Sequence, residues 1–327
     1  MFLPQTFTAA LLLIVVSMLC WGSWPNFMKA LPGWRLEYFY LDYTFGGLLM
    51  AILLAATLGS LGFAGTDFLR RLSVADVRQM AWAVTGGFIW NFGNILLLIG
   101  IMIAGIAVAY PVASVLAIII GVGLGYVAQP IGNGPALALA VIILCVAAWA
   151  NAASYKDLSQ VSGTGVRKAL VLSLIAGVLI GLFAPFVGRA ISGTHPLDPY
   201  ILAICFLLGS LVATLVAIPI LLAHPLVGKP AGLSGYFTGP LLWHLMGLIA
   251  GAVWCLGTVS YFASAGVVGV AIGWGIGSGA PMVGALWGIF LWKEFAKADR
   301  RAKRLISTSM ALYTIGVVTV AIAYQLR

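Results

Sequence analysis

Aromatic and polar side chains that can bind a small solute recur inside long apolar segments of this chain. The first group surrounds Pro25 and consists of Trp21, Ser23, Trp24 and Asn26. A proline removes one backbone donor and frees a carbonyl group one turn earlier, while indole rings stack on flat solutes. The alternative is an aromatic belt at a membrane interface with an ordinary helix kink. One motif can serve both purposes.

The second group lies in the third apolar segment and consists of Trp90, Asn91 and Asn94. The two asparagines are three residues apart and therefore share one face of a helix. An amide both donates and accepts hydrogen bonds, which suits the hydroxyl or amide groups of a neutral solute. The alternative is that these amides form hydrogen bonds between helices.

Three further helical faces combine an aromatic ring with a hydroxyl group about one turn away. They are Trp254 with Thr258 and Tyr261, Tyr110 with Ser114, and Trp274 with Ser278. These residues predict a central cavity lined from both halves of the chain. The alternative is a set of lipid-facing aromatic rings beside small serines that allow close packing.

Ionisable side chains are rare inside the apolar segments. Asp42 lies about one turn inside the second segment, where protonation could couple a proton gradient to transport. The same position is typical of an interfacial carboxylate at a helix start. His244, near the start of the eighth segment, can titrate near neutral pH, although histidines at such positions commonly lie among lipid headgroups.

Other patterns argue against an enzyme. The chain has no metal-ligand spacing, no G-x-S-x-G motif and no cluster of histidines with carboxylates. Gly273–Gly279 resembles a dinucleotide fingerprint, but it lies within an apolar segment and follows no strand. We therefore expect no catalytic residue, no metal and no cofactor.

Composition identifies the elements that position these side chains. Of the 327 residues, 62% are apolar and 8% are charged, whereas a soluble domain has about 25% charged residues. The mean hydropathy is +1.11. The sequence predicts an all-α membrane protein, with apolar segments at 8–28, 38–60, 80–102, 105–127, 134–152, 168–188, 199–223, 239–262, 266–291 and 305–325. The net charge of +9 favours contact with anionic membrane lipids over nucleic acid.

The ten predicted spans divide into two similar halves. A shift of 164 residues aligns Trp90 with Trp254, Tyr110 with Trp274, and Ser114 with Ser278. Shorter shifts align Tyr38 with Tyr200, and Pro25 and Lys29 with Pro185 and Arg189. We therefore expect two five-helix repeats, at 1–160 and 161–327. Because five spans reverse the direction of the chain, the repeats would be inverted.

Loop charges predict the orientation. One side carries Lys29, Arg35, Lys156, Arg167, Lys168, Lys229, Lys293, Lys297, Arg300, Arg301, Lys303 and Arg304. The other side carries Arg70, Arg71, Arg78, Arg189 and Arg327. The first side should be cytoplasmic, which leaves both termini outside. The three arginines of the 65–78 loop oppose this orientation.

Several motifs resemble one branch of the drug/metabolite transporter superfamily, that of glucose/ribose porters and ureide permeases. They are the stretches CWGSWP at 20–25, WRLEYFYLDYTFG at 34–46, LGS at 58–60 and WKEF at 292–295. The resemblance implies two inverted five-helix repeats, a central site from the first four helices of each half, and peripheral fifth and tenth helices. It also implies import of sugars, ureides or nucleobases with protons.

Together these observations predict a secondary active transporter for a small neutral polar solute such as a sugar, a ureide or a nucleobase. It would be a proton-coupled importer working by alternating access in a bacterial inner membrane. The first alternative is an exporter of metabolites or drugs, and the second is a membrane receptor or scaffold that transports nothing. The predicted partners are the solute, a coupling proton, membrane lipids and a second copy bound through the peripheral helices.

Overall fold

The structure is a computed structural model that describes residues 1–60, 68–155 and 165–326. These residues form fourteen helices and no strand. The helices are α1 (Phe7–Ser23), α2 (Pro25–Lys29), α3 (Leu36–Ala56), α4 (Phe68–Ser73), α5 (Val77–Ala104), α6 (Ile106–Ala128), α7 (Gly134–Ser154), α8 (Gly165–Ala190), α9 (Pro199–Ala223), α10 (Ser234–Phe237), α11 (Leu241–Val268), α12 (Val270–Gly277), α13 (Ala280–Phe290) and α14 (Arg300–Gln325).

Within the described residues, ten helical segments are long and apolar enough to cross a membrane. The predicted all-helical class and the ten spans are therefore confirmed. The first span comprises α1 with α2, and the ninth comprises α12 with α13. The first span is interrupted at Trp24, directly before Pro25, whose missing backbone donor leaves a carbonyl group free one turn earlier.

Two glycines make the tight junctions where consecutive spans nearly touch. Gly105 separates α5 from α6 with φ 78° and ψ 165°, and Gly269 separates α11 from α12 with φ 86° and ψ 156°. An L-residue with a side chain rarely adopts such angles. Each junction therefore reverses the chain within a single residue, and the two junctions have nearly the same geometry.

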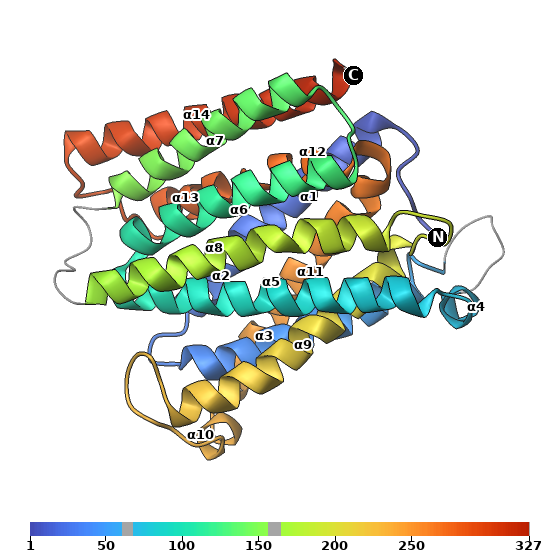
Figure 1. Cartoon of the computed structure of the whole chain (residues 1–327). Helices are drawn as coiled ribbons and strands as arrows, with labels where there is room; N and C mark the ends of the chain where they lie inside the picture. The colour runs from blue at the N-terminus through green and yellow to red at the C-terminus, as the bar shows by residue number, and fades with distance from the viewer. Residues whose placement is uncertain (61–67, 156–164, 327) are drawn as a thin grey trace.

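The spans form a bundle with two edges and a central layer (Figure 1). Helices α7 and α14 pack against each other at one edge, and α3 packs against α9 at the opposite edge. In the centre, α5 packs on α8 and α9, while α11 packs on α1 and α3. Helix α6 packs on α7 and α8 and contacts α12. The start of α1 and the end of α14 lie at the same end of the bundle (Figure 1).

Two central contacts require glycine because backbones touch. A Cβ atom at Gly87 would lie 1.9 Å from the carbonyl oxygen of Phe206, and one at Gly251 would lie 1.9 Å from that of Tyr43. These contacts join α5 to α9 and α11 to α3. Small residues at such crossings are typical of helix association in lipid.

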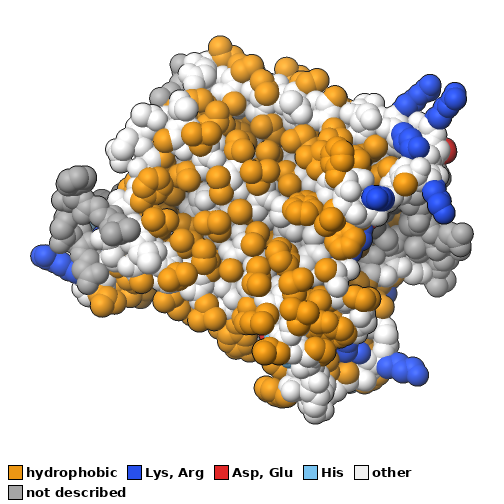
Figure 2. All heavy atoms as spheres, turned by 180° about the vertical axis from the view of Figure 1, so that it is seen from behind, with side chains coloured by type: hydrophobic (Ala, Val, Ile, Leu, Met, Phe, Trp, Pro, Cys, Tyr) orange, Lys and Arg blue, Asp and Glu red, His pale blue; other side chains and the backbone are white. Residues whose placement is uncertain are grey.

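The outer surface matches a membrane environment. Large apolar side chains cover the broad middle of the face in Figure 2, and Lys and Arg side chains gather toward its two opposite ends. Leu12, Leu49, Ile142, Trp149 and Ile220 are among the exposed apolar residues. This distribution agrees with an integral membrane protein whose basic loops lie near lipid headgroups.

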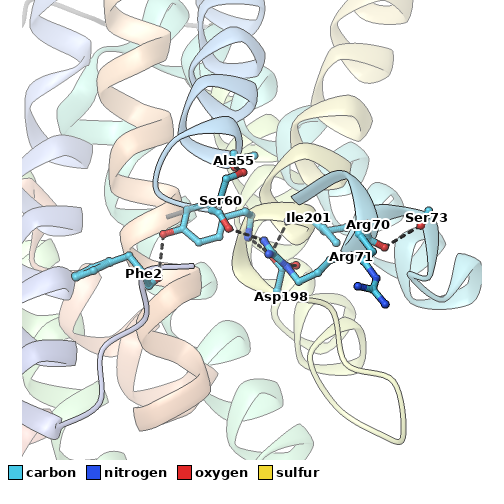
Figure 3. A network of polar contacts seen from close by, with 10 residues as sticks. Phe2, Ala55, Ser60, Arg70, Arg71, Ser73, Asp198 and Ile201 are labelled. Carbon is cyan, nitrogen blue, oxygen red and sulfur yellow. Dashed lines mark hydrogen bonds and ion pairs between the residues drawn. The ribbon is translucent and has the colours of Figure 1, made fainter. Parts of the chain in front are cut away.

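One ion pair anchors the connection that follows the second span. Arg71 of α4 pairs with Asp198 at 3.1 Å and donates to the carbonyl oxygen of Gly59 at 2.7 Å (Figure 3). Asp198 also accepts from the backbone amides of Tyr200 and Ile201 and so caps α9. Arg71 therefore has a structural role in a loop whose charges oppose the predicted orientation.

The predicted boundary between the repeats, at residues 160 and 161, lies outside the described residues. Lys156 and Arg327, two of the counted basic residues, do so as well.

Candidate functional site

A central cavity of about 170 Å³ lies between the two halves of the bundle. Its lining comes from α1, α5, α6, α8, α9, α11, α12 and α13 and contains no charged side chain among the described residues. Eleven of the predicted site residues line it: Trp21, Trp24, Trp90, Asn94, Tyr110, Ser114, Trp254, Thr258, Tyr261, Trp274 and Ser278. The structure thus brings together side chains that are up to 257 residues apart in sequence.

Stacked tryptophans form one wall of the cavity. The rings of Trp90 and Trp254 stack at 4.7 Å between centroids with an interplanar angle of 27°. Tyr43 packs between Trp254 and Trp24, at 5.7 and 4.6 Å. Because Trp90 and Trp254 already contact each other, no flat solute fits between these two rings. They can instead present an aromatic surface against which a ring lies.

A second aromatic group closes the cavity toward the end of the bundle where both termini lie. Trp274 packs against Trp21, Phe183 and Tyr261, with centroid distances of 5.7, 4.7 and 6.5 Å. Its indole nitrogen donates to the carbonyl oxygen of Ala117 on α6 at 3.1 Å. Trp274 is therefore held by both its ring and its polar edge.

Few polar atoms of the lining remain available to a solute. The Asn94 amide nitrogen donates to the Tyr40 hydroxyl at 2.8 Å, whereas its oxygen has no hydrogen-bond partner among the described residues. The hydroxyl of Tyr110 likewise has none within residues 1–60, 68–155 and 165–326. The cavity thus offers a carbonyl acceptor from Asn94 and a phenol from Tyr110 that both donates and accepts.

The smaller hydroxyl groups of the lining are already bonded to their own helices. Ser114 donates to the carbonyl oxygen of Tyr110, Thr258 to that of Trp254, and Ser278 to that of Trp274, at 2.8, 3.0 and 2.7 Å. The Thr258 oxygen also accepts from the Trp21 indole nitrogen at 3.2 Å. These hydroxyls retain lone pairs and can act as acceptors.

Three predicted site residues do not line the central cavity. Asn91 is 1% exposed, and its amide bonds Tyr40, Ser210 and Thr214. Asn91 therefore forms hydrogen bonds between helices in this structure. The other two residues, Ser23 and Asn26, lie toward the end of the bundle away from the termini. The Ser23 hydroxyl accepts from the Trp287 indole nitrogen at 2.9 Å.

Asn26 supports the break in the first span. Its amide nitrogen donates to the carbonyl oxygens of Gly22 and Ser23, at 3.4 and 3.1 Å. Its amide oxygen accepts from the Trp292 indole nitrogen at 2.6 Å. Asn26 lines an outer chamber of about 390 Å³, which shares Trp21, Trp24, Asn94 and Tyr110 with the central cavity.

Asp42 lies away from the central cavity, where α3 meets α11. Its carboxylate lies 2.9 Å from Nδ1 of His244 and accepts from the Tyr236 hydroxyl at 2.5 Å. Asp42 is 2% exposed. Burial and the Asp42 carboxylate raise the pKa of Tyr236, so this phenol remains a donor at neutral pH. The structure thus joins the two ionisable residues singled out inside the segments.

Sequence reasoning missed several residues of the two cavities. Phe183 and Phe206 line the central cavity, and nothing in an apolar segment distinguishes such phenylalanines from core residues. Asn151 on α7 lines the outer chamber. Its signal in the sequence is that of Asn91 and Asn94, an amide inside an apolar segment.

Comparison with known proteins gives relatives of one kind. The family model described as ureide permease matches residues 39–160. Ureide permease 1 of Arabidopsis thaliana is 22% identical over 97% of both chains, and ureide permease 2 of the same plant is 21% identical over the same shares.

A solved crystal structure matches the fold with a TM-score of 0.67 at 14% identity, over 98% of this chain and 99% of that one. The family model and the two plant relatives support the part of the predicted resemblance that concerns ureide permeases. The chain is similar, over nearly its whole length, to ureide permeases, which are membrane transporters and not enzymes.

Proposed function

We propose that the protein is a secondary active transporter for ureides, that is, small neutral solutes that carry N–H groups beside a carbonyl. One observation carries this proposal: an uncharged, aromatic cavity lies at the centre of a ten-span bundle and is lined from both halves. The names of the relatives favour ureides over sugars within the predicted solute class.

The free polar atoms suit such a solute. The Asn94 oxygen would accept from an N–H group, and the Tyr110 hydroxyl would donate to the carbonyl. A flat ureide ring would lie against the stacked pair Trp90 and Trp254. Because the lining has no charge among the described residues, a strongly charged solute would lose its hydration without compensation.

The proposed architecture is that of two inverted repeats. In the proposed repeat, α1, α3 and α5 of the first half correspond to α8, α9 and α11 of the second. Exchanging each helix for its counterpart turns the packing of α5 on α8 and α9 into the packing of α11 on α1 and α3. The glycine junctions at 105 and 269 correspond under the shift of 164 residues, and the stacked Trp90 and Trp254 correspond under the same shift. This arrangement is also that of the drug/metabolite transporter superfamily.

Transport would proceed by alternating access, because the two ends of the cavity differ. At the end with the termini, α6 contacts α12, and the backbone amide of Val270 donates to the Gln129 side chain at 3.3 Å. At the other end, Tyr110 of α6 and Gly284 of α13 both line the outer chamber. The opposite state would close α6 against α13 and open α6 from α12.

Proton coupling is assigned to the Asp42 and His244 pair. A buried carboxylate beside an imidazole can hold or release a proton at modest cost. The pair joins α3 to α11, so a change in its charge would alter the contact between the two halves. Because the pair lies away from the central cavity, it would couple to the solute indirectly, through the contact of α3 with α11.

The proposed orientation places the outer chamber at the cytoplasmic side and both termini outside, in a bacterial inner membrane. The support is the larger number of Lys and Arg residues in the loops at the chamber side. A homodimer would use the lipid-facing sides of α7 and α14, where Ile142, Trp149 and Ile322 are exposed.

Counterflow in proteoliposomes tests the function. Vesicles loaded with allantoin should accumulate labelled allantoin, and the variant Trp254→Leu should lose most of this exchange because the aromatic surface is removed. Phe290→Leu is the control, since Phe290 is an aromatic residue that is 74% exposed on α13 and lines neither cavity. Absence of exchange for allantoin and uracil would refute the ureide proposal; exchange of sugars would favour the sugar alternative, and outward drug flux the exporter.

A further inference from the structure

The outer chamber is larger and more polar than the central cavity. Its volume is about 390 Å³. It adjoins the central cavity through shared lining residues and extends to the end of the bundle where Lys29 and Glu294 lie. A solute moving between the central cavity and this end of the molecule must therefore pass through it.

Helix α7 contributes an unengaged amide to the chamber. Asn151 is 5% exposed, and its side-chain amide has no hydrogen-bond partner in the part of the chain that the structure describes. A buried amide without a partner loses the hydrogen bonds that it makes in water. Tyr155 follows four residues later and so lies on the same side of the helix. Both side chains line the chamber.

A carboxylate lies on the same lining in a fixed position. Glu294 accepts from the Tyr155 hydroxyl at 3.3 Å and forms an ion pair with Lys29. Burial and the Glu294 carboxylate raise the pKa of Tyr155, which keeps the phenol protonated as a donor. The ammonium group of Lys29 also lies 4.9 Å from the centroid of the Trp292 ring. These contacts come from α2, α7 and the connection after α13.

We propose that the outer chamber is a second binding site for the transported solute, with Asn151 and Glu294 as its principal hydrogen-bonding residues. The Glu294 carboxylate accepts from the N–H groups of a ureido or amide function, while the Asn151 amide donates to its carbonyl. The ureides proposed for the central cavity carry both kinds of group, the N–H donors and the carbonyl acceptor. This inference rests on the proposed function, because it takes ureides as the solute class.

The two sites differ in what holds the solute. The central cavity offers aromatic surface with an amide oxygen and a phenol, whereas the outer chamber offers a carboxylate, an ammonium group and a free amide. The outer site is wider, so we expect it to bind more weakly and to accept a broader range of N–H solutes. It would hold the solute before entry to, or after release from, the central cavity.

Equilibrium binding of labelled allantoin to purified full-length protein tests the second site. Wild-type protein should bind two equivalents with different affinities. Asn151→Leu and Glu294→Gln should each weaken the lower-affinity site about tenfold and leave the other site intact. Trp254→Leu, at a residue that lines the central cavity and not the chamber, should weaken the higher-affinity site and leave the lower-affinity site intact. Retention of one site in every variant shows that the variant is folded.

Glu37→Gln is the matched control. Glu37 lies at the same end of the bundle and pairs with Arg35 at 2.8 Å, but it does not line the chamber. A second measurement uses Asn151→Cys in the Trp254→Leu background, where allantoin should protect the new thiol from a maleimide.

The outcomes separate the two proposals. A single equivalent of allantoin, unaffected by Asn151→Leu and Glu294→Gln, would overturn the second site and leave the proposed function intact. A changed exchange rate in these variants with unchanged allantoin binding would also overturn the second site, because Asn151 and Glu294 would then control passage through the chamber without binding the solute. Absence of all allantoin binding would overturn the proposed function and this inference with it.

Discussion

Asn91 and Asn94 show how neighbouring residues of one type acquire different roles. Both face the same side of α5, but α9 covers Asn91, and both ends of its amide are bonded within the protein. Asn94 lies one turn further along, where its oxygen reaches the cavity. Their spacing correctly groups them on one face. Which of the two asparagines contacts a solute depends on where α9 packs, and their spacing in the sequence gives no information on that.

The two asparagines therefore predict contrasting variants. Asn94→Leu should lower allantoin affinity at the central cavity about three- to tenfold, since one hydrogen bond to the solute is lost. Asn91→Leu should instead lower the free energy of unfolding by about 1–3 kcal/mol, because buried partners on α9 lose their hydrogen bonds. Binding isotherms and thermal unfolding in detergent measure the two effects. Equal losses of affinity in both variants would contradict the assignment.

Asp42 gives a prediction about energy coupling. Asp42→Asn should abolish accumulation driven by a pH gradient, because the proton-binding group is gone, and should retain counterflow, which needs no net proton movement. Uptake into proteoliposomes with and without an imposed gradient measures both. Glu37→Gln, in the same helix, should keep both activities. Gradient-driven accumulation by Asp42→Asn at the wild-type level would exclude this site as the coupling group.

The Asp42 contact also marks a limit of sequence reasoning at this scale. Asp42 and His244 were each recognised as ionisable residues within apolar segments. They lie 202 residues apart, and nothing in one sequence pairs two such residues, since their contact follows from the packing of α3 on α11. Asn151 is an amide within the fifth apolar segment that the sequence analysis did not single out, and the resemblance implies a peripheral fifth helix.

At the scale of elements, apolar segment length predicted most of the fold. All ten spans exist in the described residues, because roughly 20 apolar residues are the length a bilayer requires. The sequence left a break and an ordinary kink at Pro25 as alternatives, and the structure has an interruption there, between α1 and α2. The break between α12 and α13 was not predicted. It lies within the glycine-rich segment Gly273–Gly279, which was attributed to helix packing.

Backbone contact between α11 and α3 gives a prediction about assembly. Gly251→Ala should lower stability by about 1–3 kcal/mol, because the added methyl group would lie 1.9 Å from the Tyr43 carbonyl oxygen. Gly266→Ala, on the same helix with open space beside it, should be neutral or stabilising, since alanine favours a helix. Unfolding temperatures of the two variants provide the comparison. Similar losses in both would mean that α11 is not in close contact with α3.

At the scale of the whole molecule, the two ends of the central cavity are not equivalent. One end is closed by α6 against α12, and the other adjoins the outer chamber. The contacts between helices therefore differ at the two ends of the cavity. Under the proposed alternating access, the two sets of contacts would interchange and expose the cavity to the opposite side.

Thiol labelling tests this interchange. In a background with the four native cysteines replaced by alanine, Gly284→Cys should react with an impermeant maleimide from the chamber side. Gly125→Cys should be protected, because its side chain would meet Ala271 across the closed end. Conditions that make Gly125→Cys reactive should protect Gly284→Cys. Reactivity of both positions that rises and falls together would contradict alternating access.

The Trp90 and Trp254 stack has a consequence for spectroscopy. Two indole rings 4.7 Å apart and 27° from parallel couple their electronic transitions, so the pair should give a split near-ultraviolet circular dichroism band. One ring belongs to each half of the bundle, so relative movement of the halves changes the geometry that sets this splitting. The protein thereby carries an intrinsic optical reporter of its own conformational state, which needs no attached dye.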